Sequence, residues 1–161
     1  MLNLEAGALR AADRLLPLAA RVPSGVQRAV LQRAANRLFA DALADGAFDI
    51  LDGHWLRLEV SDLGLAWSLT HHRNGLRFDD ACSPSVTIRG SWRDFLLLAG
   101  RQEDPDTLFF RRRLVIEGDT ELGLAVKNLI DSLDPDSLPA WLWSAMRRAS
   151  RVVQENAEPL P

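Results

Sequence analysis

The residue types most often used for metal binding are sparse in this chain. There are three histidines, His54, His71 and His72, and one cysteine, Cys82. His71 and His72 are adjacent, and neighbouring residues of a strand point to opposite faces, so the two cannot easily ligate one ion. The sequence therefore predicts solvated histidines at the end of a strand, and no metal site.

The sequence motifs of catalytic sites are equally sparse. Cys82 or a serine can be combined with a histidine and an aspartate on paper, but no nucleophile elbow accompanies them. Asp79-Asp80, and Asp104 with Asp106, are candidate carboxylate pairs for acid-base chemistry. A hairpin end and a helix-capping turn explain these carboxylates more simply. We expect no catalytic residues, no cofactor and no enzymatic activity.

A run of three arginines, Arg111 to Arg113, follows Phe109 and Phe110. Three consecutive arginines cannot all be buried, so part of the run faces water. Two interpretations remain open. The run is either a docking patch for lipid headgroups or an acidic partner, or the solvated side of the entry to a strand.

The stretch from residue 104 to residue 133 must position this arginine run. It opens with an Asp104-Pro105 turn, continues through a strand at 114–116, and bends at Gly118. A helix follows, with Asp119 or Thr120 as its cap. Its apolar residues recur with the spacing of one buried stripe. They are Leu122, Ala125, Val126, Leu129, Ile130 and Leu133.

The remaining periodicity predicts helices at both ends and strands in the middle. An amphipathic helix is limited by Pro17 and the 23–25 break, and a second begins at Ser24 and ends at Gly46. Alternation predicts strands near 55–60, 66–70, 76–78 and 86–88, with a hairpin turn at 73–75. Ser91 and Asp94 form a capping box for a helix to about residue 100, and a last helix follows residues 134–136.

Composition points to one soluble globular domain. The chain has 161 residues, of which 47% are apolar and 25% charged, and its formal net charge is -3. No apolar run is long enough to span a bilayer, and the net charge gives no general attraction to nucleic acid. The first residues do not read as a secretory signal, and one cysteine agrees with a reducing cytoplasm. Through residue 40, six arginines oppose only Glu5 and Asp13, so a basic N-terminal face is expected.

The run DPDTLFFRRRLVIEGDTELGLAVKNLIDSL resembles the C-terminal half of a sterol-carrier-protein-type lipid-binding domain. RRRLVIEGDTELGL is its most specific part, and the similarity is dense over Arg101–Asp131 and diffuse over Phe39–Ser91. It extends to the family members that act as accessory factors in bacterial ubiquinone biosynthesis. The resemblance implies an α+β fold, in which a mostly antiparallel sheet of about five strands and its flanking helices enclose an apolar tunnel. We expect a terminal helix at 1–22, the lipid-binding domain at 23–134, and a C-terminal helix and tail at 135–161.

The resemblance implies a non-enzymatic carrier. It would hold the polyprenyl tail of ubiquinone precursors and present their heads to the UbiU and UbiV iron–sulfur hydroxylases of the oxygen-independent route. The bound lipid would be a ligand and not a cofactor. Alternation and helical stripes select the residues expected to line its pocket. They are Trp67, Leu69, Phe78, Val86, Ile88, Phe95, Phe110, Leu114, Ile116, Val126 and Leu129.

A cytoplasmic protein with transient contact to the inner membrane is expected, through basic and aromatic surface residues. The candidates for this membrane or partner surface are Arg10, Arg14, Arg111, Arg112, Trp143, Arg147 and Arg151. Two other classes stay open. The chain could be a general phospholipid or fatty-acyl binding protein, or a scaffold for the hydroxylases in which the pocket is vestigial.

Overall fold

The computed structural model describes residues 2–73, 75–80 and 83–156, so Asn74 of the predicted turn and Cys82 lie outside the described residues. One five-stranded sheet runs through it in the order β3-β2-β1-β4-β5. Its strands are β1 Leu56–Val60, β2 Leu65–His72, β3 Gly75–Phe78, β4 Val86–Gly90 and β5 Val115–Gly118. Three neighbouring pairs are antiparallel, but β1 and β4 run parallel. The α+β prediction is confirmed, with a mixed sheet.

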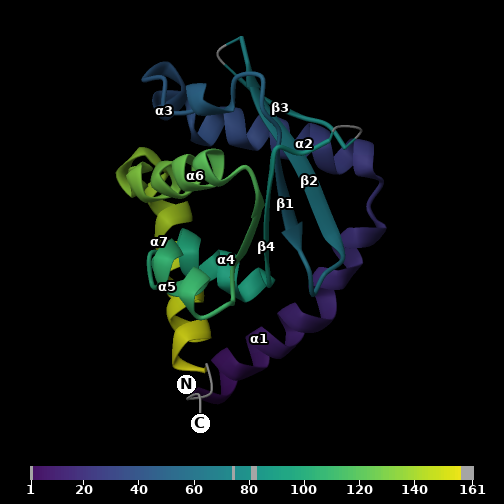
Figure 1. Ribbon diagram of the computed structural model, residues 1–161. Coiled ribbons are helices and arrows are strands. Elements are labelled where there is room, and N and C mark those ends of the chain that lie inside the picture. The colour runs from purple at the N-terminus through teal and green to yellow at the C-terminus, as the bar shows by residue number, and fades with distance from the viewer. Residues whose placement is uncertain (1, 74, 81–82, 157–161) are drawn as a thin grey trace.

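Helices lie around this sheet (Figure 1). The α-helices are α1 Leu2–Leu15, α2 Ser24–Leu38, α3 Ala40–Ala44, α4 Trp92–Ala99, α5 Pro105–Phe110, α6 Thr120–Ser132 and α7 Ala140–Glu155. Three short 3-10 helices are η1 Leu16–Arg21, η2 Asp49–Leu51 and η3 Pro135–Ser137. Helices α4, α5, α6 and α7 gather on one side of the sheet, α2 lies against β3, and α1 meets α7 at the lower end.

Three predicted helix starts are confirmed by their caps. The Ser91 side chain accepts from the backbone N–H of Asp94, whose carboxylate accepts in return from the N–H of Ser91. The Asp119 carboxylate accepts from the N–H of Leu122 at 2.9 Å. Asp104 accepts from the side chain and backbone of Thr107, and these hydrogen bonds lower the pKa of Asp104. Each cap satisfies a donor that the first helical turn leaves free.

Two local predictions were wrong. Ser24 does not cap α2, because the capping position is Pro23 and no side-chain cap bond forms. The predicted helix from 24 to 46 is also interrupted at Phe39, but its predicted end is confirmed, because α3 ends at Ala44 and Gly46 follows with a φ of +76°. The Asp104-Pro105 turn opens the short helix α5, because Asp104 caps it and Pro105 fits its first turn.

The main core lies between the sheet and the helices on its covered face. Side chains from η2, β4, α5 and α6 fill it, as do those from the segment before β5. Leu51, Val86, Ile88, Leu108, Leu114 and Val126 are at most 1% exposed. A smaller cluster of Leu9, Leu97 and Val153 joins α1, α4 and α7. The N-terminal helix is therefore attached through a contact separate from the sheet.

The two edges of the sheet differ. At β3, the Asn36 side chain of α2 donates to the carbonyl of Leu76 and accepts from its N–H, both at 2.8 Å. The N–H of Phe78 donates to Gln32 Oε1 at 3.0 Å. These side chains occupy positions that a further strand would use. Strand β5 ends the sheet on the other side.

Candidate functional site

A cavity of about 350 Å³ lies where α4, α6 and α7 converge. Its volume falls in the range of small-molecule sites. Most of its lining is apolar. The residues that line it are Leu38, Phe39, Phe95, Leu98, Ala99, Arg101, Ile130, Leu133, Asp134, Pro135, Leu138, Leu142, Trp143 and Met146. We call this space the α7 cavity.

Helix α7 covers one side of this cavity with Leu142, Trp143 and Met146. It packs closely on α4 at one point, where Gly100 follows the helix and meets the buried Ser150. A side chain at Gly100 would place its Cβ 2.0 Å from Ser150 Oγ and 2.5 Å from Ser150 Cβ. The glycine therefore permits the approach of α7 that closes the cavity.

The polar groups of the α7 cavity lie with the ends of α4 and α6. Arg101 donates to the carbonyl of Asp131 at 3.2 Å and to that of Leu133, and so ties the two helix ends together. Arg101 has a φ of +57°, which is uncommon for a residue with a side chain. Asp134 caps η3 beside it. A mostly apolar space with charged groups beside it suits an amphiphile whose chain is buried and whose head is near water.

A larger groove of about 570 Å³ lies between α1, α4 and α7. It is apolar as well, with Trp92, Leu96 and Trp141 among its lining residues and Arg148 beside them. This groove adjoins the small Leu9 cluster, whereas the α7 cavity borders the main core through Leu98. We take the α7 cavity as the candidate site because the main core and the sheet support its walls.

The predicted pocket residues are divided among several places. Phe95 lines the α7 cavity, and Phe110 and Ile116 line a third groove of about 280 Å³. Trp67 lies under α2 and donates to Gln27 Oε1 at 2.9 Å. The others pack within or against the main core: Leu69, Phe78, Val86, Ile88, Leu114, Val126 and Leu129. Their role as lipid contacts stays a prediction.

The sequence reasoning missed the part of the lining that α7 supplies. Leu142 of α7 and Leu138, which lies just before α7, line the cavity. The amphipathic character of the last helix was the available signal, because such a helix packs its apolar side against other apolar groups.

The predicted surface residues also differ in their settings. Trp143 lines the α7 cavity, and the guanidinium of Arg147 lies 5.9 Å from the centre of its ring. Arg111 pairs with Glu103 at 3.6 Å. The other predicted arginines are exposed and have no ion-pair partner among the described residues; they are Arg10, Arg14, Arg112, Arg147 and Arg151. Contact with a membrane or a partner through this set stays a prediction.

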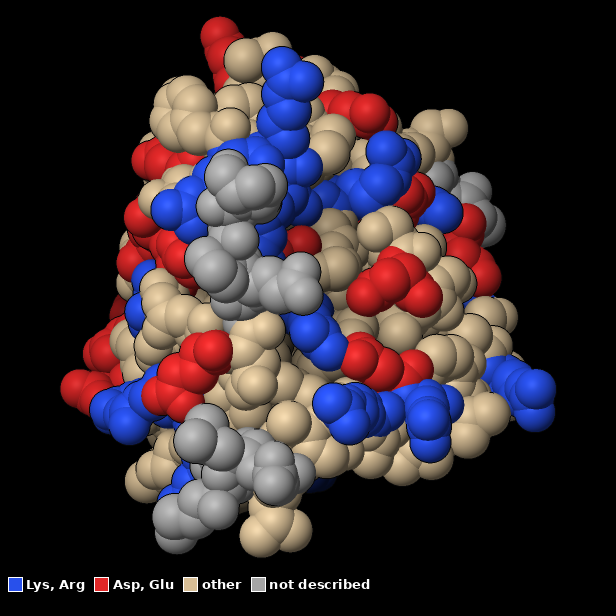
Figure 2. Space-filling model, turned by 90° about the horizontal axis from the view of Figure 1, so that it is seen from below, with Lys and Arg blue, Asp and Glu red and all other residues tan. Residues whose placement is uncertain are grey.

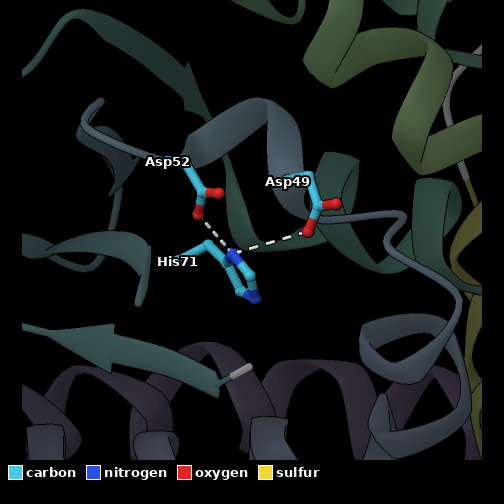
Figure 3. Close-up of side chains that lie close together, drawn as sticks. All are labelled: Asp49, Asp52 and His71. Atoms are coloured by element: carbon cyan, nitrogen blue, oxygen red, sulfur yellow. Dashed lines mark hydrogen bonds and ion pairs between the residues drawn. The ribbon is translucent and has the colours of Figure 1, made fainter. Parts of the chain in front are cut away.

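His71 corrects the prediction of solvated histidines, because its side chain is only 5% exposed. Figure 3 shows its ring facing Asp52 and Asp49, with Nδ1 2.5 Å and 3.7 Å from their Oδ1 atoms. The separation of Nδ1 from Asp52 Oδ1 is that of a short hydrogen bond. Nδ1–H thus donates to Asp52 and fastens the loop after η2 to β2.

The candidate carboxylate pairs have cationic partners or capping roles. Asp79 and Asp80 pair with Arg28 of α2. Asp106 pairs with Lys127 at 2.5 Å, and Asp104 caps α5. These carboxylates therefore have structural roles, as ion-pair partners or as a helix cap.

None of the described helices has the length and apolarity needed to cross a bilayer. Residues 31–131 match the model of the SCP-2 sterol transfer family. The chain is 37% identical over 139 residues to the ubiquinone biosynthesis accessory factor UbiT of Escherichia coli K12, which covers 86% of this chain and 80% of the relative. UbiT of E. coli O157:H7 gives the same values. A solved structure, the UbiJ-SCP2 ubiquinone synthesis protein, has the same fold, with a TM-score of 0.54, 20% identity, and coverage of 66% of this chain and 95% of that one.

Proposed function

The chain belongs to the SCP-2 sterol transfer family and to the UbiT accessory factors of ubiquinone biosynthesis, and from this premise we propose that it is a non-enzymatic lipid carrier. It holds polyprenylated ubiquinone precursors for the oxygen-independent route. The α7 cavity takes part of the apolar tail, and the aromatic head stays near Arg101 at the ends of α4 and α6.

The observation that carries this proposal is the apolar cavity beneath α7. Burying a methylene group is worth about 0.8 kcal/mol, so about ten buried carbons contribute about 8 kcal/mol before ordering costs. As an upper limit, this free energy corresponds to a Kd of about 1 μM. Binding of this strength needs no charged group in the site, and it is weak enough for the lipid to be released.

The route of the cargo is part of the same proposal. The carrier presents the aromatic head to the UbiU and UbiV hydroxylases, acts in the cytoplasm, and meets the inner membrane transiently, where it collects its apolar cargo. The redox chemistry belongs to the partner enzymes in this proposal.

A second candidate is a general phospholipid or fatty-acyl carrier. It is favoured by the mostly apolar side chains that line the cavity. Such a lining binds the acyl or prenyl chain of a lipid without distinguishing one headgroup from another. A scaffold with a vestigial pocket is the third possibility, and it predicts that the cavity has no effect on quinone synthesis.

The test is the lipid that remains with the purified protein. Extraction and mass spectrometry should yield a polyprenylated phenol or quinone precursor from the wild-type protein, and about tenfold less from Leu142→Asp, which puts a charge into the cavity. Leu4→Asp is the matched control, because Leu4 is exposed on α1 and does not line the α7 cavity.

Three results would argue against the quinone carrier. Phospholipid alone would support the second candidate. Equal lipid in both variants would remove the α7 cavity from the proposal. A folded Leu142→Asp variant that sustains normal quinone synthesis without bound lipid would support the scaffold.

A further inference from the structure

A row of large apolar side chains faces solvent along the N-terminal segment. It begins at the end of α1, passes through η1, and continues on α2, with one residue every three or four positions. Their exposed fractions lie between 41% and 62%. The row consists of Leu15, Leu18, Val22, Val26 and Val30, and we call it the N-terminal apolar row. An apolar series of this length on a surface normally marks an interaction site.

Helix α2 carries this row although much of its opposite side is polar. Gln27 accepts from Trp67, Gln32 accepts from the backbone of β3, and Asn36 makes two hydrogen bonds with that strand. The side of α2 that faces solvent instead carries the exposed side chains of Val26 and Val30. A helix that only covered a sheet edge would place polar residues outward. The exposed valines therefore call for a function beyond packing.

Within the chain segment that carries most of the row, the charged residues are all basic. Between Asp13 and Asp41 the chain holds five arginines and no acidic residue. Arg28 pairs with Asp79 and Asp80, whereas Arg14, Arg21, Arg33 and Arg37 are exposed and have no ion-pair partner among the described residues. Asp13 is turned toward α4, where its carboxylate accepts from Trp92 and Arg93.

The spacing on α2 joins the apolar and basic residues on one face. Val26, Val30, Arg33 and Arg37 lie at i, i+4, i+7 and i+11, which is one line along the helix. Figure 2 shows the molecule from below the view of Figure 1, and basic side chains are spread over this side with acidic side chains next to several of them.

We propose that the N-terminal apolar row and its four unpaired arginines form the surface by which this protein docks on an anionic lipid bilayer. The row enters the boundary between headgroups and acyl chains, and Arg14, Arg21, Arg33 and Arg37 contact lipid phosphates. The helices lie in the plane of the surface. The inference rests on the proposed carrier function and names its membrane-contacting side, which differs from α7 and from the Arg111–Arg113 run.

An anionic bilayer fits this surface better than a protein partner or a second copy of the chain. Four unpaired arginines would oppose four more across a symmetric contact, which costs free energy. Apolar groups interspersed with basic ones and lacking acidic ones form the pattern of helices that lie on anionic membranes.

Sedimentation with vesicles tests the proposal. Wild-type protein should bind vesicles of equal phosphatidylcholine and phosphatidylglycerol, and should bind phosphatidylcholine alone at least about tenfold more weakly. Val26→Asp with Val30→Asp should reduce binding to the anionic vesicles by about tenfold or more, and so should Arg33→Gln with Arg37→Gln. These positions are exposed, so the variants should fold normally.

Two matched controls locate the surface. Leu124→Asp changes an equally exposed apolar residue on α6, and Arg73→Gln with Arg148→Gln removes the same number of positive charges from exposed positions outside the row. Both should bind vesicles as the wild type does. Equal loss in the row variants and the control variants would overturn the assignment of the surface.

The lipid retained by each variant separates this inference from the carrier function. A row variant that loses vesicle binding but keeps its extractable lipid supports docking through the row. Failure of wild-type protein to bind anionic vesicles would overturn the docking proposal, and so would concentration-dependent dimerisation that the row variants abolish. Absence of extractable lipid from every form would instead reject the carrier function.

Discussion

At the scale of single residues, Glu59 on β1 shows how the exposed face of the sheet is held. Its carboxylate accepts from Arg57 of the same strand at 2.8 Å and from Arg89 of β4 at 2.6 Å. These hydrogen bonds, that of Arg57 first, lower the pKa of Glu59 below its usual 4.5. The ion pair between Glu59 and Arg89 links β1 to β4, the two neighbouring strands of the sheet that run parallel.

This lowered pKa predicts a pH dependence. The folded state binds fewer protons at Glu59 than the unfolded state, so the stabilisation is complete above about pH 4.5 and is lost as the pH falls through the lowered pKa. Glu59→Gln should cost at most about 1 kcal/mol at pH 7, because the group is partly exposed. The difference in the free energy of unfolding from wild type, measured in urea, should shrink on acidification. A difference that stays constant to pH 3 would contradict this.

The buried ring of His71 leads to a second prediction. Asp52→Ala removes the acceptor of its Nδ1–H and leaves that donor buried, which should cost about 1–3 kcal/mol. Asp49→Ala is the control, because Asp49 lies 3.7 Å from Nδ1 and is as exposed as Asp52. Urea denaturation of both variants measures the two losses. Equal losses would show that the hydrogen bond to Asp52 has no special weight.

At the scale of elements, the contact between α4 and α7 determines whether the α7 cavity is closed. Gly100→Ala introduces a Cβ that Ser150 must avoid, so α7 should be displaced at a cost of about 1–3 kcal/mol. Amide hydrogen exchange in α7 should accelerate, and the retained lipid should decrease. Gly7→Ala on α1 is the control, because a Cβ there would meet nothing within 4 Å.

A second substitution tests the cause of that effect. Ser150→Gly in the Gly100→Ala background removes the atoms that the new Cβ would meet most closely. Slow exchange in α7 should return in this double variant. Continued fast exchange would assign the effect to the backbone at Gly100 and not to the packing of α7.

The elements were predictable wherever local chemistry determines them. The capping residues Ser91, Asp104 and Asp119 act within one helical turn, and the alternation around Leu56 and Leu69 reflects burial on one face of a strand. The α7 cavity was not predictable in the same way. Its wall joins Phe39, Phe95 and Leu142, whose proximity depends on long-range packing and on the small size of Gly100.

At the scale of the whole molecule, two apolar clusters of unequal size hold the chain together. Leu108 is fully buried in the main core, so Leu108→Ala should cost about 2–5 kcal/mol. Leu9→Ala affects a cluster with three buried members among the described residues and should cost less. Unfolding free energies in urea compare the two. A larger loss for Leu9→Ala would show that α1 contributes to the main folding unit.

The hydrogen bonds from Asn36 and Gln32 to β3 have a consequence for self-association. Two molecules that join through their β5 edges each present a β3 edge, on which the N–H and C=O of Leu76 and the N–H of Phe78 already have partners from α2. Strand-by-strand growth needs two free margins per molecule. The architecture therefore limits such joining to pairs and blocks open-ended fibrils of the native fold.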